Sequence, residues 1–301
     1  MKILISGASG LVGTKLTAAL RAEGHTVAHL VRPVAALPPG NVPWDPAAKI
    51  LDPVAMEGAD AVVNLSGAGI GDGRWTPARK QVLRASRIDA TRVLVDALAQ
   101  MKRKPRVLIS ASATGIYGDR GDEILTELSR SGEDFLAGLA RDWEAEAKRA
   151  ESSGIRTVLA RFGVILSTSG GALVRMLPPF KLCLGGRLGT GKQWMSWVAM
   201  EDVLGILRAA IADDRYSGPY NVVSPNPVQN AVFTRALAEM LHRPAIFPAP
   251  AFALRLALGE MADALLLSSQ RAQPERVLAA GYPFRFNHIE PALRALLLGR
   301  V

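Results

Sequence analysis

The chain has little of several residue types that commonly mark a function. Its 301 residues contain one cysteine, Cys183, and four histidines. A single thiol cannot form an intrachain disulfide, so the composition predicts a reducing compartment. The histidines have neither the spacing nor the neighbouring carboxylates of a metal site, and we expect no metal ion. They are His25, His29, His242 and His288.

Aromatic residues are also scarce, at 6% of the chain. The net charge of +9 is compatible with nucleic acid, with an acidic ligand such as a phosphorylated cofactor, or with a scattered basic surface. The densest basic segment, residues 102–106, is a short loop before an expected strand and contains no aromatic residue. Because bases need aromatic surfaces on which to stack, we expect no nucleic acid as a partner.

Long apolar runs are missing as well. The most apolar stretch, residues 251–267, is interrupted by Arg255, Glu260 and Asp263, which predicts a buried or amphipathic helix and no membrane partner. Met1 leads directly into an apolar strand, without the basic and apolar regions of a signal peptide. We therefore expect a cytoplasmic protein.

Strand and helix patterns alternate over the first half of the chain. The strand patterns lie at residues 3–5, 25–31, 59–65, 106–110 and 155–166, and helical patterns at 77–101 and from the N-cap Ser131 to Gly154. This order predicts an α/β fold, a doubly wound parallel sheet of the Rossmann type, over residues 1–167. Glycine and proline are frequent afterwards, with helical patterns at 228–241, 251–267 and 289–298. Residues 168–301 are predicted to form a smaller substrate-side lobe.

The most informative motif lies at the start of the chain. A short strand runs into glycines spaced three residues apart, and a helical pattern follows. Such glycines allow a sharp turn, a close approach of the backbone to a pyrophosphate, and tight packing of the helix, whose first N–H groups face the anion. The motif predicts dinucleotide binding by this loop. Its expected contact residues are Gly7, Ser9, Gly10, Leu11, Val12 and Gly13.

The residue after the second strand indicates which dinucleotide binds. In NAD-preferring sites an acidic residue here bonds the ribose hydroxyls, and it would repel a 2′-phosphate. This chain has Arg32 at that position, with no carboxylate nearby. A guanidinium can hold a phosphate through two hydrogen bonds and lie against the adenine. We predict NADP(H); the alternative is a solvated arginine at a strand end.

Further motifs carry a family resemblance. Ser110 to Gly118 reads Ser-Ala-Ser-Ala-Thr-Gly-Ile-Tyr-Gly, and Asn64 to Gly67 reads Asn-Leu-Ser-Gly. The other motifs are Trp75, Ser86 with Arg87, residues 134–136, Trp143 with Glu144, and residues 161–166, 185–193, 197–202 and 221–227. Together they resemble the extended short-chain dehydrogenase/reductases, in particular the atypical "epimerase family" branch of sugar-nucleotide epimerase-like proteins, some labelled cell-division-inhibitor-like. The resemblance spans nearly the whole chain, including a C-terminal segment (about 250–301) like that branch's own extension.

The resemblance implies further cofactor contacts. The loop after the third strand pattern, with Leu65, Ser66 and Gly67, is expected to line the dinucleotide site. Arg87, on the next helix, is expected to reach the cofactor phosphates or the substrate, and a solvated helix arginine is the alternative. Arg161 lies in an apolar strand pattern, so it needs a partner for its charge.

The resemblance also implies a catalytic group that this chain lacks. The wider superfamily catalyses hydride transfer with a serine, a tyrosine and a lysine. The tyrosine passes the proton, and the charge of the lysine lowers the pKa of the tyrosine. Ser112 stands at the serine position, but no Tyr-x-x-x-Lys occurs in the chain, and alignment on Glu144 places Leu136 and Ala140 at those two positions. Tyr117 is the available substitute as a general acid, and packing is its alternative role.

Two functions follow from these expectations. The first is an NADP(H)-dependent oxidoreductase or epimerase-like enzyme that acts on an unidentified small molecule through Ser112 and Tyr117. The second is a non-catalytic NADP(H) binder that reports redox state to a partner protein, which the missing Tyr/Lys pair favours. For the oligomeric state, the assembly considered is a homodimer, which no motif in the sequence specifies.

Overall fold

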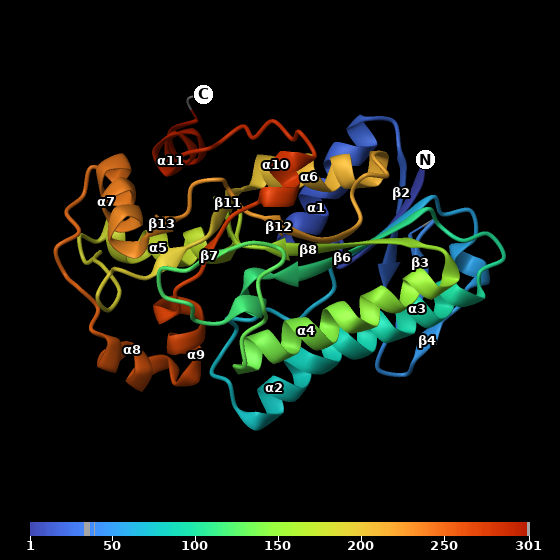
Figure 1. Cartoon of the computed structure of the whole chain (residues 1–301), viewed down its shortest axis with the longest axis horizontal. Helices are drawn as coiled ribbons and strands as arrows, with labels where there is room; N and C mark the ends of the chain where they lie inside the picture. Colours follow the sequence, from blue (N-terminus) through green and yellow to red (C-terminus); the bar gives the residue numbers. More distant parts are fainter. Residues whose placement is uncertain (33–36, 39, 300–301) are drawn as a thin grey trace.

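The computed structural model describes residues 1–32, 37–38 and 40–299. Its centre is an eight-stranded sheet in the order β12-β8-β6-β5-β1-β2-β3-β4, in which all pairs are parallel except β3 with β4 (Figure 1). These strands are β1 (Lys2–Ser6), β2 (Thr26–Val31), β3 (Val42–Asp45), β4 (Ile50–Leu51), β5 (Ala61–Asn64), β6 (Val107–Ala113), β8 (Arg156–Phe162) and β12 (Gly218–Val222). The predicted doubly wound parallel sheet is confirmed.

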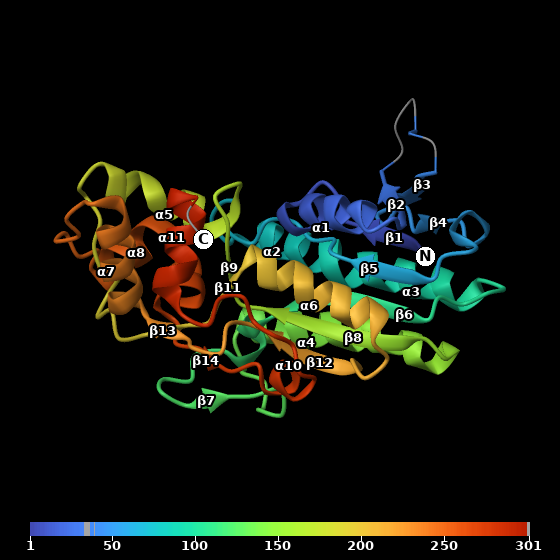
Figure 2. The same ribbon diagram turned by 90° about the horizontal axis from the view of Figure 1, so that it is seen from above.

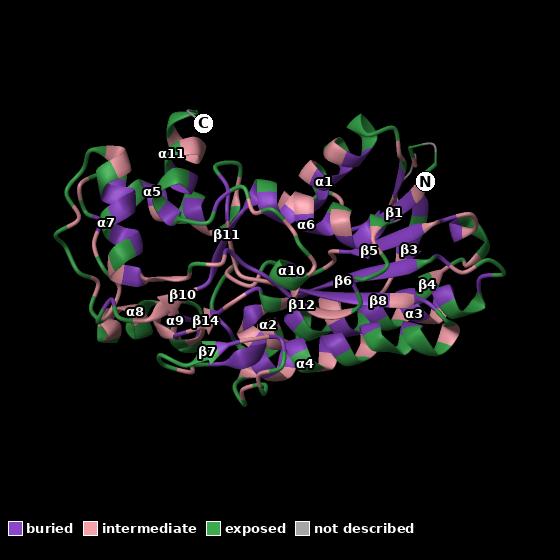
Figure 3. Ribbon diagram, turned by 45° about the horizontal axis from the view of Figure 1, so that its top comes forward, coloured by how far each residue is buried: buried purple, intermediate pink, exposed green. Residues whose placement is uncertain are grey.

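Helices cover both faces of the sheet, which explains why its central strands are apolar throughout. One face carries α1 (Leu11–Ala22), α6 (Met200–Ala212) and α10 (Glu275–Ala279), and the other carries α2 (Pro77–Arg84), α3 (Ala90–Gln100) and α4 (Phe135–Lys148) (Figure 1). All four residues of β5 are buried, and Figure 3 shows the central strands as the buried layer. Short 3₁₀ turns complete these layers. They are η1 (Val54–Met56), η3 (Thr114–Tyr117) and η4 (Arg149–Ser153).

The helix predicted at residues 77–101 is present but contains a π-helical turn. This turn, η2 (Ala85–Asp89), joins α2 to α3 without a break. The inserted turn shifts the register of the side chains that follow, and such turns are frequent at functional sites. Arg87 lies within it.

Two predicted boundaries were wrong. The N-cap of α4 is Asp134, whose carboxylate accepts a hydrogen bond from the Ala137 N–H at 2.8 Å, so Ser131 lies outside the helix. The strand predicted at residues 155–166 is interrupted at Gly163, where an added Cβ would lie 2.4 Å from the Ser196 carbonyl oxygen. The chain therefore leaves β8 and continues as β9 (Val164–Leu166), which pairs with β11 (Trp197–Ala199).

The division predicted at residue 167 does not follow the layers of the molecule. β12 and α6 both come after that residue, yet they complete the central sheet and one of its helical layers. The remaining helices of the second half form a lobe at the end of the molecule opposite the N-terminal strands (Figure 2). They are α5 (Gly171–Lys181), α7 (Asn230–Leu241), α8 (Ala251–Leu258), α9 (Glu260–Ala262) with the π-helical η5 (Asp263–Leu267), and α11 (Ile289–Leu298).

Three two-stranded ladders connect this lobe to the central sheet. Besides β9 with β11, they are β10 (Trp194–Met195) with β13 (Val228–Gln229), and β7 (Ile124–Leu125) with β14 (Arg271–Ala272). The last pairing ties the C-terminal segment to the loop after β6. The carboxyl edge of the sheet therefore faces the lobe, which is where ligands bind in open α/β folds.

Candidate functional site

The glycine loop lies between β1 and α1, where the strand order reverses. Gly7 has a φ of +68°, and a Cβ there would lie 2.6 Å from the carbonyl carbon and oxygen of Leu65. A Cβ on Gly13 would lie 2.4 Å from the Gly7 oxygen. The loops after β1 and β5 therefore touch through backbone atoms at Gly7, and a side chain there would separate them. A side chain at Gly13 would instead push α1 away from the Gly7 and Ala8 backbone of its own loop.

Among the described residues, no side chain caps the N-terminus of α1 or places a carboxylate in its first turn. Its N-cap is Gly10, which makes no side-chain capping bond, and the first turn contains no acidic residue. Ser9 and Gly10 are exposed, while Leu11 and Val12 are half-buried. The close backbone packing at Gly7 and Gly13, together with the open helix start, fits a loop that binds the pyrophosphate of a dinucleotide.

Arg32 lies beside this loop. Leu30 pairs with Ser6 across β1 and β2, so the residues that follow each strand are neighbours. Arg32 is exposed immediately after β2, and the chain contains no Asp or Glu between Thr26 and Trp44. The second strand thus ends in a positive charge at the place where NAD-preferring sites carry a negative one.

Arg87 holds the loop that follows β5. The Arg87 guanidinium donates to the carbonyl oxygens of Ala68 at 3.0 Å and Leu83 at 3.3 Å, and lies over the Trp143 ring. Burial and the neighbouring Arg79 lower the pKa of Arg87 to about 10. Gly67 lies directly against this guanidinium, because an added Cβ would be 3.1 Å from its Cζ. Arg87 therefore supports the loop that the sequence assigned to the cofactor.

Asn64, the first residue of the Asn-Leu-Ser-Gly motif, has a structural role that the motif did not indicate. It is fully buried at the end of β5, accepts a hydrogen bond from Ser6 Oγ at 2.7 Å and donates to Thr91 Oγ1 at 2.8 Å. The Trp143 Nε1–H donates to the same threonine at 2.9 Å. This amide fixes the carboxyl ends of two neighbouring strands against α3, and so fixes the two loops of the cofactor site.

Ser112 belongs to a buried polar network. Its hydroxyl donates to Glu144 Oε1 at 2.7 Å, and Glu144 accepts two further bonds from Arg161, at 2.7 and 2.8 Å. Burial alone would lower the pKa of Arg161, but its hydrogen bonds to Glu144 and Tyr117 raise it overall. The predicted partner for the Arg161 charge is thus confirmed. The Ser112 hydroxyl is bonded to this ion pair, and the residue as a whole is 2% exposed.

Tyr117 closes the other side of the same network. Its hydroxyl donates to Asn221 Oδ1 at 2.6 Å and accepts from Arg161 Nη1 at 3.0 Å, and its side chain has no exposed surface. Burial raises the pKa of Tyr117, against the opposing effect of Arg161. The geometry favours the packing role for Tyr117 over that of a general acid.

Glu127 extends the network beyond what the sequence indicated. Its Oε1 accepts the backbone N–H groups of Asn221 at 3.0 Å and Arg276 at 3.3 Å, while Oε2 is buried without a hydrogen-bond partner. Burial raises the pKa of Glu127. Nothing in the sequence separates Glu127 from its exposed neighbours, because its environment comes from β12 and α10.

The positions expected for the Tyr/Lys pair lie in apolar surroundings. Leu136 packs against Gly115, whose added Cβ would lie 3.4 Å from the Leu136 Cβ, and Ala140 is buried. Leu136 packs against the apolar cluster formed by Trp75, Leu83, Ile88, Ala111, Leu139, Trp143 and Met261. Ala140 belongs to a second cluster, with Ile116, Tyr117, Leu125, Val223 and Ala272. Met261 belongs to the C-terminal segment, which an ion pair between Lys80 and Glu260 also fastens over α2.

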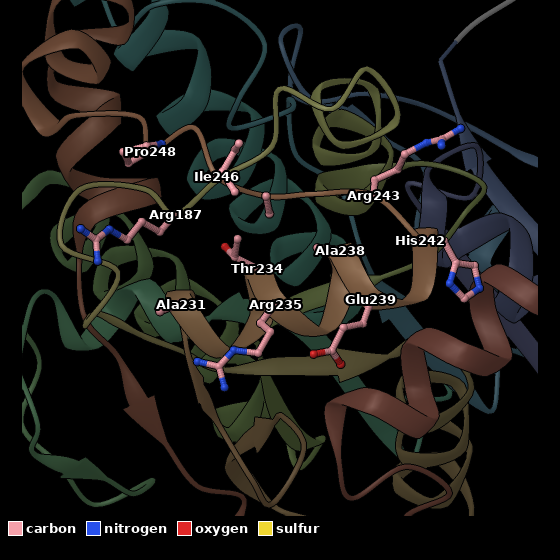
Figure 4. Close-up of a pocket in the computed structure, with 11 residues that line it drawn as sticks. Arg187, Ala231, Thr234, Arg235, Ala238, Glu239, His242, Arg243, Ile246 and Pro248 are labelled. Carbon is pink, nitrogen blue, oxygen red and sulfur yellow. The ribbon is translucent and has the colours of Figure 1, made fainter.

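A cavity of about 810 Å³ lies elsewhere in the lobe, between α7 and the chain that follows it (Figure 4). Figure 4 shows Thr234, Ala238 and Ile246 near its centre, with Arg187 and Arg235 on one side and Arg243 on the other. No residue of the glycine loop lines this cavity. It is therefore separate from the dinucleotide site.

Within the described residues, no three or more His, Cys, Asp or Glu side chains are grouped so that they could hold a metal ion. No helix in this part of the chain is long and apolar enough to cross a membrane.

Comparisons with known proteins assign the chain to a family. Residues 3–223 match the model of the NAD dependent epimerase/dehydratase family, and residues 249–296 match a domain of unknown function, DUF1731. An epimerase family protein of Mycobacterium bovis is 46% identical over 294 residues, which cover 97% of this chain and 96% of that one.

Two solved structures are also similar over nearly all of this chain. The human epimerase family protein SDR39U1 (isoform 2), solved with NADPH, has a TM-score of 0.91 and 31% identity over 100% of both chains. A nucleoside-diphosphate sugar epimerase from Corynebacterium glutamicum has a TM-score of 0.80 and 38% identity, covering 99% of this chain and 58% of that one. The chain belongs to the NAD dependent epimerase/dehydratase family, in the extended short-chain dehydrogenase/reductase branch whose members are named epimerase family proteins.

Proposed function

We propose that the protein binds NADP(H) at the reversal point of its sheet. The observation that carries this proposal is the glycine loop between β1 and α1, where close backbone packing leaves no room for a Cβ at Gly7 or Gly13. The uncapped start of α1 and the positive charge of Arg32 support a phosphorylated dinucleotide. The human relative solved with NADPH supports the same choice of cofactor.

In this proposal each residue has a separate task. The backbone N–H groups of Ser9, Leu11, Val12 and Gly13 bind the pyrophosphate, while the Gly10 N–H donates to the Gly7 carbonyl oxygen at 3.0 Å. The Arg32 guanidinium binds the 2′-phosphate. Leu65, Ser66 and Gly67 form the wall opposite the glycine loop, and Arg87 holds that wall in place. The nicotinamide ring supplies hydride chemistry when the cofactor is bound.

Of the two possible uses of the cofactor, the geometry favours a non-catalytic one. Both hydroxyl groups proposed for proton transfer, on Ser112 and Tyr117, are engaged by buried protein partners. Leu136 and Ala140 cannot exchange protons at the positions of the superfamily's Tyr/Lys pair. The favoured function is therefore an NADP(H)-binding sensor or scaffold that reports the cofactor state to a partner protein.

The second candidate is an oxidoreductase or epimerase-like enzyme that acts on an unidentified small molecule. Membership of a family named for epimerases and dehydratases, over most of the chain, favours it. In this version Ser112 and Tyr117 are the catalytic residues. Loss of turnover in Ser112→Ala or Tyr117→Phe, with NADPH affinity retained, would favour the enzyme over the sensor.

The cofactor proposal is tested by titrating NADPH and NADH into Arg32→Glu and into a matched control, Arg130→Glu, which changes another exposed arginine. We expect Arg32→Glu to weaken NADPH binding about tenfold or more and to leave NADH binding unchanged or stronger, because a carboxylate repels the 2′-phosphate. Arg130→Glu should bind both as the parent does. Parental affinities in Arg32→Glu would contradict the assignment of the 2′-phosphate to this residue.

We propose that the protein is cytoplasmic. Its single cysteine, Cys183, cannot form an intrachain disulfide, which supports a reducing compartment.

A further inference from the structure

One side of α7 carries small side chains. Ala231, Thr234 and Ala238 are three and four residues apart, so they lie along the same side of the helix. The larger Phe233 and Leu237 pack in the buried cluster that α7 shares with α5 and α11. The small side chains therefore leave space between α7 and the chain that crosses over it.

The segment that follows α7 is held away from these small side chains. The Phe247 N–H donates to the Gly185 carbonyl oxygen at 3.1 Å. The Ala249 N–H donates to the Arg187 carbonyl oxygen at 2.9 Å. Because the segment is bonded to residues 185–187, it does not collapse onto α7. The space that remains is the cavity of about 810 Å³ in Figure 4, within the roughly 300–1,000 Å³ typical of small-molecule sites.

The cavity has an excess of positive charge. Arg187, Arg235 and Arg243 line it, and Glu239 is the only carboxylate among its lining residues. None of the three arginines forms an ion pair within the described part of the chain. Exposed arginines of α2, α3 and η4, by contrast, each pair with a carboxylate at 2.6–2.7 Å. Guanidinium groups without an acidic partner are suited to bind a phosphate or carboxylate group of a ligand.

The floor of the cavity also contains a polar group with no protein partner. Thr234 is 6% exposed, and Figure 4 shows it near the centre of the cavity. Among the described residues, none accepts or donates a hydrogen bond at its hydroxyl. Buried hydroxyl groups normally have a partner, which is protein, water or ligand. A ligand in the cavity would supply that partner.

We propose that this cavity binds a small organic anion. Its phosphate or carboxylate group pairs with the arginines, and its apolar part lies between two apolar walls. One wall is formed by Ala231 and Ala238, and the other by Ala245, Ile246 and Pro248. The Thr234 hydroxyl supplies a hydrogen bond to the ligand. No residue of the glycine loop lines this cavity, so the inference does not depend on the proposed cofactor function.

The arrangement of the charges favours a small anion over a polymeric one. Arg187 and Arg235 lie on one side of the cavity and Arg243 on the other (Figure 4). The charges therefore surround a hollow with an apolar floor. A polyanion would instead be followed by a row of basic side chains along an open groove.

The first test titrates the full chain with 8-anilinonaphthalene-1-sulfonate, a fluorescent anion with apolar rings, in the presence and absence of saturating NADP⁺. We expect the same affinity in both conditions, and a dissociation constant raised at least tenfold in Arg235→Glu/Arg243→Glu. The matched control is Arg130→Glu/Arg141→Glu, which makes the same charge change at two exposed arginines outside the cavity. Parental affinity in the first variant, or an equal loss in the control, would overturn the proposal.

A second experiment tests the floor of the cavity and the chemistry of the ligand. Ala238→Met fills the cavity and should raise the dissociation constant of the fluorophore at least fivefold. Thr234→Val keeps the shape and should raise it about twofold to fivefold, and thermal unfolding verifies that both variants are folded. Parental affinity in both folded variants would overturn the proposal.

Displacement of the fluorophore identifies the acidic group. Displacement by phenyl phosphate supports an organic phosphate, and displacement by benzoate supports a carboxylate. Polyaspartate is the polymeric competitor. Displacement by polyaspartate and by neither small anion would overturn the proposal, in favour of an open basic surface.

Discussion

Two polar clusters lie near the carboxyl edge of the same sheet, and they differ in what occupies them. In the glycine loop, the start of α1 is uncapped and Ser9 and Gly10 are exposed. In the network around Arg161, the polar groups of Glu144 and Tyr117 are bonded to protein partners and buried. The first cluster is exposed where a ligand can reach it, and the second is bonded within the protein. Under the function proposed above, the first cluster binds the cofactor and the second takes no part in proton transfer.

The largest effect should come from breaking the buried network. Glu144→Ala leaves the Arg161 guanidinium buried without its carboxylate, which should lower the free energy of unfolding by about 3–5 kcal/mol. The matched control is Asp142→Ala, which removes an exposed partner of Arg84 and should cost less than about 1 kcal/mol. Urea unfolding measures both. Equal costs would show that the network is not the stabilising element described here.

A substitution in the glycine loop should affect the ligand. Gly7→Ala places a methyl group against the Leu65 backbone, and the strain of about 1–3 kcal/mol should weaken NADPH binding about tenfold to a hundredfold. Gly24→Ala is the control, because Gly24 also has a positive φ, +81°, but an added Cβ would meet nothing within 4 Å. We expect it to lose some stability and to keep its NADPH affinity. If both variants lose NADPH affinity to a similar extent, the effect comes from strain at a positive φ and not from the contact of Gly7 with Leu65.

Removing the Tyr117 hydroxyl tests whether the buried network affects NADPH binding. Tyr117→Phe leaves Asn221 Oδ1 and an Arg161 N–H without a partner, at a cost of about 1–3 kcal/mol in unfolding free energy. NADPH affinity should not change. Tyr220→Phe is the control, since that hydroxyl donates to the Arg215 carbonyl at a partly exposed position. A drop in NADPH affinity in Tyr117→Phe alone would connect the network to the cofactor.

The smallest effect concerns Glu127. Burial raises its pKa in the folded protein above the ordinary value of 4.5, so the folded state binds a proton more readily than the unfolded state. This residue therefore favours folding most below about pH 4.5, and its contribution decreases as the pH rises through the raised pKa. Glu127→Gln should raise the Tm at pH 8 relative to the parent by more than at pH 4, whereas the exposed Glu133→Gln should change neither. Parallel pH profiles for Glu127→Gln and the parent would contradict the burial effect.

The parts of the fold that the sequence predicted are those with strong local patterns. The short apolar runs identified the early strands, and the spacing of Gly7, Gly10 and Gly13 identified the turn between β1 and α1, without tertiary information. α5 was missed because Gly171 begins it and two prolines lie in its last turns. β12 was missed because it is a five-residue strand that starts with Gly218 and Pro219 and is recognised by its pairing with β8.

The candidate site shows the same division between local and tertiary information. The role of Arg161 as a partnered charge followed from a charged residue in an apolar strand. Its partners did not follow, because Glu144 and Tyr117 reach it from α4 and from the turn after β6. The hydrogen bond from Ser112 to Glu144 also depends on that tertiary arrangement. The sequence therefore indicated the Ser112 hydroxyl as a candidate but not that it donates to Glu144.

The most direct test of the account is a fluorescence titration of NADPH and NADH into the parent protein and into the double variant Ser112→Ala/Tyr117→Phe. The account predicts that the parent binds NADPH more tightly than NADH, and that the folded double variant binds NADPH with the same affinity. If neither cofactor binds the parent, the glycine loop between β1 and α1 is not a dinucleotide site. If the double variant loses NADPH affinity while it stays folded, the separation between cofactor binding and the buried network is wrong.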